Sequence, residues 1–170
     1  MLPWFLPGVA IAVVVSLAAS GVVGRALGVR RAVAWAILLS LGIILAATWT
    51  PQAEALESGA RGPASCDLSR IGLAPIQGYL RPGDSIGNVL MFVPLGAAIG
   101  LIPRSRRKTA IVVAAIALPF AIEATQLAVP WLDRACESAD VVDNLTGLML
   151  GLVAGSLAAW IARGVERRPR

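Results

Sequence analysis

The sequence predicts an all-α fold: a polytopic transmembrane helical bundle with five spans, its N-terminus outside the cell and its C-terminus in the cytoplasm. Three observations lead to this fold class. The 170-residue chain is 57% hydrophobic with a mean hydropathy of +0.76, which is more apolar surface than one small soluble core can bury. Its apolar residues fall in five long runs. Its basic residues gather beside the ends of those runs.

Each apolar run is expected to form one membrane-spanning helix. Since a helix rises about 1.5 Å per residue, the runs would be about 25 to 32 Å long, close to the thickness of the hydrocarbon layer. Glycines recur every four residues in the third and fifth runs, a spacing that lets another helix approach closely. The five predicted spans are residues 4–23, 32–49, 86–102, 109–129 and 141–161.

The basic residues predict the orientation of the spans. Eleven of the fifteen Lys and Arg residues form three clusters, and short basic loops stay on the cytoplasmic side of a membrane. Because the first cluster follows the first span, the N-terminus is expected outside. The three clusters are Arg25/Arg30/Arg31, Arg104/Arg106/Arg107/Lys108 and Arg163/Arg167/Arg168/Arg170.

This orientation divides the chain into three predicted parts. Residues 1–31 would be an N-terminal anchor helix with a basic cytoplasmic loop, and residues 162–170 a basic cytoplasmic tail. Residues 32–161 would form a four-helix membrane domain, with a long extracellular loop at 50–85. The first span could instead be a cleaved signal peptide, but it has no Lys or Arg before its apolar core and is longer than a usual signal core. An uncleaved anchor is therefore favoured.

The two cysteines agree with this arrangement. Cys66 lies in the long loop and Cys136 in the short loop before the fifth span, so both are expected on the oxidising side of the membrane. A disulfide between them would hold the long loop over the helix ends. The alternative is two unrelated thiols.

Polar residues inside the predicted spans indicate a candidate site, because such residues are costly in a bilayer. They occur three or four residues apart, which places each pair on one helix face, and all lie near the outer ends of the last three spans. If these faces converge, they form a carboxylate-rich and amide-rich pocket open to the outside, with an arginine of the adjoining loop as counter-ion. The candidate ligand-binding residues are Asn88, Glu123, Gln126, Arg134, Asp140 and Asn144.

These residues also have a simpler interpretation. Asn88, Gln126 and Asn144 could serve only as hydrogen-bonding contacts between helices. A functional role is favoured for Glu123, which is deep and ionisable. Asp143, by contrast, is expected to be exposed and to act as a solvated or capping residue.

The residue inventory excludes several kinds of chemistry. Without histidine, neither a Ser-His-Asp triad nor a His-based zinc site is available, and two cysteines are too few for a zinc cage. No metal and no cofactor is expected. The basic residues lie beside apolar spans without interleaved aromatic residues, so nucleic-acid binding is not expected despite the net charge of +5.

Three segments resemble the VanZ-like family over about residues 41–160. The motifs N-x-x-x-F-x-P-x-G, E-x-x-Q and, after an arginine, D-x-x-x-N-x-x-G are matched in order by Asn88, Phe92, Pro94, Gly96, Glu123, Gln126, Arg134, Asp140, Asn144 and Gly147. The resemblance implies a multi-pass protein of the bacterial plasma membrane, related to one that gives resistance to the glycopeptide teicoplanin.

Three functions are compatible with these observations. The first is a non-enzymatic protein that binds or shields an envelope component, such as a lipid headgroup, a cell-wall precursor or the glycopeptide itself. The second is a small transporter or lipid-translocating protein in which Glu123 titrates. The third is an intramembrane enzyme acting on a lipid-linked envelope substrate, with Glu123 and Asp140 as acid and base.

Overall fold

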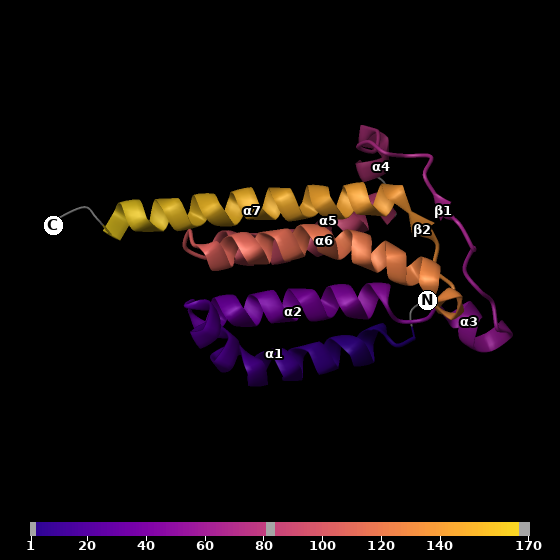
Figure 1. The fold of residues 1–170 in the computed structure, drawn as a ribbon, viewed down its shortest axis with the longest axis horizontal. Helices are drawn as coiled ribbons and strands as arrows, with labels where there is room; N and C mark the ends of the chain where they lie inside the picture. Colours follow the sequence, from indigo (N-terminus) through magenta and orange to yellow (C-terminus); the bar gives the residue numbers. More distant parts are fainter. Residues whose placement is uncertain (1–2, 81–83, 167–170) are drawn as a thin grey trace.

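The computed structural model describes residues 3–80 and 84–166. Long helices run side by side, and short elements cross their ends on one side (Figure 1). The long helices are α1 (Phe5–Leu27), α2 (Arg31–Thr48), α5 (Asp84–Gly100), α6 (Arg106–Ala128) and α7 (Ser138–Glu166). The short elements are α3 (Ala53–Ser58), β1 (Cys66–Asp67), α4 (Ile76–Leu80), the 3-10 helix Pro130–Leu132 and β2 (Cys136–Glu137).

Four of the long helices, α1, α2, α6 and α7, are long and apolar enough to cross a membrane. The third predicted span corresponds to α5, which is apolar but has only 17 residues. At about 1.5 Å per residue it is roughly 25 Å long, slightly less than the hydrocarbon thickness. The fifth predicted span is longer than expected, because α7 has 29 residues.

Local signals explain where the helices reverse. Gly28 ends α1 in the left-handed conformation with φ 69°, which glycine adopts without steric cost. Ser105 begins α6, and its hydroxyl accepts a hydrogen bond from the Lys108 N–H at 3.1 Å, as an N-cap residue should. The predicted basic tail is only partly described, since residues 167–170 lie outside the described ranges.

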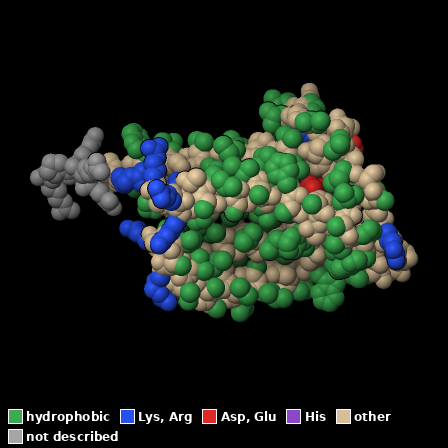
Figure 2. Space-filling model, in the orientation of Figure 1, with side chains coloured by type: hydrophobic (Ala, Val, Ile, Leu, Met, Phe, Trp, Pro, Cys, Tyr) green, Lys and Arg blue, Asp and Glu red, His purple; other side chains and the backbone are tan. Residues whose placement is uncertain are grey.

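The reversals bring the described members of the three basic clusters to one end of the bundle. In Figure 2 most of the visible Lys and Arg side chains gather at the end where α7 finishes. We call this the basic end. The opposite end, where α2 and α6 finish and α7 begins, carries the segment between α2 and α5, and we call it the loop end.

Close packing of α5 against α7 organises the centre of the bundle. The two helices run parallel, and the glycines of α7 lie directly on the backbone of α5. A Cβ atom added to Gly147 would lie 2.0 Å from the carbonyl oxygen of Val89, and one added to Gly151 would lie 2.2 Å from that of Val93. The prediction that these glycines permit close helix approach is therefore confirmed. Phe92 on α5 and Leu148 on α7 are fully buried in the adjoining apolar core.

Substitution of Gly147 by alanine is expected to destabilise the fold by about 1–3 kcal/mol, because the added methyl group forces α5 and α7 apart. Gly164→Ala is the matched control, since Gly164 lies on the same helix and has open space where a Cβ would be. That change should be neutral or stabilising by up to about 1 kcal/mol through helix propensity. Unfolding in mixed micelles with increasing SDS, followed by circular dichroism, measures both; equal effects would contradict the packing argument.

Candidate functional site

The loop end is closed by a covalent connection between the long loop and the start of α7. Strand β1 pairs with β2 in parallel, with Cys66 opposite Cys136, and the two cysteines form a disulfide with their Cα atoms 4.5 Å apart. Further along the loop, the Gly62 N–H donates to the carbonyl of Pro130 at 2.9 Å. The loop is therefore held over the helix ends at several points.

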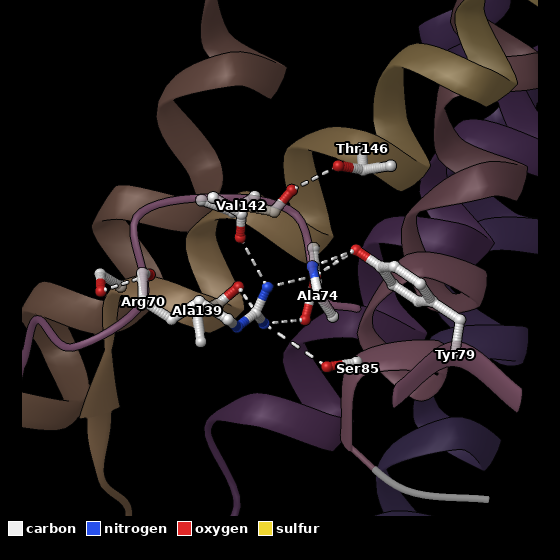
Figure 3. A network of polar contacts seen from close by, with 10 residues as sticks. Arg70, Ala74, Tyr79, Ser85, Ala139, Val142 and Thr146 are labelled. Atoms are coloured by element: carbon white, nitrogen blue, oxygen red, sulfur yellow. Dashed lines mark hydrogen bonds and ion pairs between the residues drawn. The ribbon is translucent and has the colours of Figure 1, made fainter. Parts of the chain in front are cut away.

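A buried ion pair makes a second connection between the loop and α7. The guanidinium of Arg70 donates to both carboxylate oxygens of Asp143, at 2.5 and 3.2 Å. The hydroxyl of Tyr79, on α4, donates to the same carboxylate at 3.1 Å. Figure 3 shows the Arg70 side chain between Ala139 of α7 and Ser85 of α5, with Tyr79 approaching from α4. We call Arg70, Tyr79 and Asp143 the loop clamp.

The prediction that Asp143 is exposed is wrong. Its side chain is 0% exposed, because the loop folds back over the second turn of α7 and Arg70 covers the carboxylate. The hydrogen bond to Asp143 raises the pKa of Arg70, so the guanidinium stays charged. The signal available in the sequence was that Arg70 lies outside the three basic clusters, on the side predicted to be poor in positive charge.

Glu123 and Gln126 lie together on the buried face of α6. Glu123 is 5% exposed, and its Oε2 accepts a hydrogen bond from the Glu137 N–H at 2.7 Å. The Gln126 amide lies 3.3 Å from the carbonyl of Thr48. With the amide turned over, its NH₂ group instead donates to Ala135 O at 3.1 Å and to Glu123 Oε2 at 3.2 Å. In that orientation two N–H donors converge on the Glu123 carboxylate.

Arg134 reaches from the loop before α7 to the end of α2. Its Nη2 donates to the carbonyl of Ala47 in the last turn of α2, which has no partner within the helix, and to that of Thr50 just beyond the helix, at 2.7 and 3.1 Å. Burial lowers the pKa of the Arg134 guanidinium, while the nearby charges of Asp140 and Asp133 act in the opposite direction. Arg134 therefore ties the end of α2 to the loop that precedes α7, within electrostatic range of Asp140.

Asp140 links the remaining predicted residues. It is half-buried in the first turn of α7, and its charge acts on both Glu123 and Arg134. One turn further along α7, Asn144 is buried, and its Oδ1 has no hydrogen-bond partner among the described residues. All six predicted residues lie toward the loop end. We call the five on α6, α7 and the loop between these helices the polar layer: Glu123, Gln126, Arg134, Asp140 and Asn144.

Asn88 is the sixth predicted residue. The structure describes no contact between its side chain and the polar layer. It is half-buried on α5, next to Val89, whose carbonyl lies against Gly147. The backbone beside Asn88 therefore lies at the α5–α7 interface.

The cavity beside the polar layer is mostly apolar, unlike the predicted pocket. It has a volume of about 340 Å³, and Glu123 is the only one of the six predicted residues that lines it. The loop, α6 and α7 each contribute to its wall. Its lining residues are Leu68, Ile71, Phe120, Glu123, Cys136, Glu137, Ser138, Val141, Val142 and Leu145. We call it the loop-end cavity.

This arrangement suits binding of an apolar group. The accessible wall of the cavity is almost wholly apolar and can take up an alkyl or aromatic group, and the carboxylate of Glu123 lies buried directly behind that wall. Among the described residues, no group of three or more acidic or sulfur-bearing side chains has an arrangement that could hold a metal ion.

The fold and the site together define a helical membrane protein with a disulfide-tethered loop covering a cavity at one end of its bundle. A family model described as VanZ/LLP1 matches residues 33–159. The chain belongs to the VanZ/LLP1 family, as its motifs indicated. No curated protein and no solved structure gives a significant match.

Proposed function

We propose that this protein binds an amphipathic component of the bacterial envelope in the loop-end cavity and thereby alters susceptibility to glycopeptide antibiotics. The observation that carries the proposal is an apolar cavity at the loop end with the buried carboxylate of Glu123 directly behind its wall. The ligand's apolar part would lie against Leu68, Ile71 and Phe120, and a donor group of the ligand would meet Glu123.

The proposed topology places this cavity on the outer side of the plasma membrane. We propose that all five long helices span the bilayer, with the N-terminus outside and the C-terminus in the cytoplasm. Support comes from the basic end, since positive charge is retained on the cytoplasmic side. The disulfide at the loop end also fits an oxidising compartment. A ligand in the outer leaflet or a cell-wall precursor would then reach the cavity directly.

Glu123→Gln tests the assigned role of the carboxylate. Glutamine has nearly the same shape and can still accept the hydrogen bond from the Glu137 N–H, but it has no charge for the ligand. Loss of one charged hydrogen bond is expected to weaken ligand binding about tenfold or more. The minimal inhibitory concentrations of teicoplanin and vancomycin are measured in a sensitive host expressing wild type or variant at equal membrane levels.

Wild type is expected to raise the inhibitory concentration of at least one of the two glycopeptides, and Glu123→Gln to return it toward the value of the empty host. Glu57→Gln, a change of an exposed acid on α3, is the matched control and should behave as wild type. The proposal fails if wild type changes neither concentration. Turnover of a lipid-linked precursor by purified protein, lost in Glu123→Gln, would replace binding with catalysis.

A further inference from the structure

A second cavity lies at the basic end, and the proposed function does not use it. Its volume is about 880 Å³, larger than that of the loop-end cavity. It lies where α5 ends, α6 begins and α7 finishes. The side chains of Arg104, Lys108 and Arg163 line it, and none of the lining residues whose side chains the structure describes is acidic.

The position of Lys108 fixes one positive charge in this cavity. Its ammonium group donates to the carbonyls of Gly100 and Ile102, at 2.9 and 3.0 Å, so it sits on the C-terminal end of α5. The charges of Arg104 and Arg163 both act on Lys108. Three like charges that face one cavity repel one another, and an anion between them would remove that repulsion.

The cavity also has an apolar wall that continues away from the charges. Trp160 and Leu157 line it and are 68% and 52% exposed. Val153 belongs both to this cavity and to an apolar groove of about 560 Å³ farther along α7. Met149 and Leu150 line that groove and are also exposed. Positive charge and apolar surface therefore follow one another along α7.

We propose that the basic-end cavity is a binding site for an anionic phospholipid, with the phosphate between Arg104, Lys108 and Arg163 and an acyl chain along the apolar groove of α7. Basic pockets between membrane helices suit lipid phosphates, and Trp160 is of the type that lies at the headgroup level. A free phosphate ion would use the charges but leave the adjoining apolar groove without a role. The joined cavity and groove therefore favour the lipid.

The test uses full-length protein in a neutral detergent, its disulfide intact, examined by native mass spectrometry with added dioleoyl-phosphatidylglycerol or dioleoyl-phosphatidylcholine. The wild type is expected to retain phosphatidylglycerol at lower concentrations than phosphatidylcholine. Each basic residue near a membrane surface contributes about fivefold in affinity, so Arg104→Gln/Arg163→Gln should weaken phosphatidylglycerol binding roughly 25-fold. Both arginines are exposed, and helicity by circular dichroism checks the fold of the variant.

Arg25→Gln/Arg30→Gln is the matched control. It removes the same charge from exposed residues that line none of the cavities described above, and it should keep the wild-type preference. Equal losses in the two double variants, or no preference in wild type, would overturn the proposal. The wild type alone gives a further test: displacement of the lipid by glycerol phosphate or inorganic phosphate would identify a free-phosphate site instead.

Discussion

Arg70→Ala is expected to lower the free energy of unfolding by about 3 kcal/mol, the lower end of what breaking a buried ion pair costs. The reason is that the change leaves the carboxylate of Asp143, which is 0% exposed, without its counter-ion. The lower end is chosen because the Arg70 side chain is 25% exposed, and water already reaches part of the pair. Unfolding in mixed micelles with increasing SDS measures the loss.

Replacing Asp143 should cost less stability than replacing Arg70. Asp143→Asn leaves behind a guanidinium that water can reach, so it should destabilise less than Arg70→Ala. Replacing both at once, as Arg70→Met/Asp143→Leu, removes the stranded charge and should recover part of the stability. Asp133→Asn is the control, because Asp133 has a positive φ of 54°, which asparagine tolerates. A loss as large in the control as in Arg70→Ala would contradict the role of the loop clamp.

Removal of the disulfide, as Cys66→Ala/Cys136→Ala, is expected to destabilise the fold by about 2 kcal/mol. A cross-link over a separation of 70 residues would contribute about 4 kcal/mol in a fully unfolded chain. The smaller value follows because helices that stay inserted in a micelle already restrict the unfolded chain. The same SDS titration measures it, with reduction of the wild type as an independent route to the same state.

The local consequence of that change should be larger than the global one. With the disulfide gone, the described contacts that hold the loop are noncovalent: the loop clamp, the hydrogen bond from the Ser138 hydroxyl to the Arg70 carbonyl at 2.8 Å, and other hydrogen bonds. Cleavage by added protease should therefore concentrate between α3 and α4. The same protease should leave the wild type largely intact. If cleavage is unchanged, the disulfide does not hold the loop, and the wall that Leu68 and Ile71 give to the loop-end cavity needs another explanation.

The positions of the long helices could be predicted because each depends on local composition. A run of apolar residues predicts a helix, Gly28 ends one and Ser105 begins another. Each of these signals depends on only a few neighbouring residues. The close approach of α5 and α7 was also readable, since glycines every four residues mark one face of a helix. The glycine spacing did not predict which helix packs on that face, because Gly147 has no side chain to specify its partner.

The candidate site was only partly predictable. Glu123 and Gln126 are both buried on α6, as their spacing predicts, and the charge of Asp140 on α7 acts on Glu123. Arg134 was expected beside carboxylates, and the charges of Asp140 and Asp133 do act on it. Its hydrogen bonds to Thr50 and Ala47, 84 and 87 residues away in the chain, were indicated by no local pattern. The apolar character of the loop-end cavity was not foreseen, because Leu68 and Ile71 come from a loop whose path no local pattern fixes.

The sequence by itself determined a helical membrane protein, its family and the gathering of basic residues at one end, because hydropathy and charge act residue by residue along the chain. Tertiary structure alone decided that Asp143 is buried, that Arg70 pairs with it, and that the loop walls a cavity beside Glu123. Those features join residues more than 50 positions apart. They depend on how the loop folds back, which only the packed structure specifies.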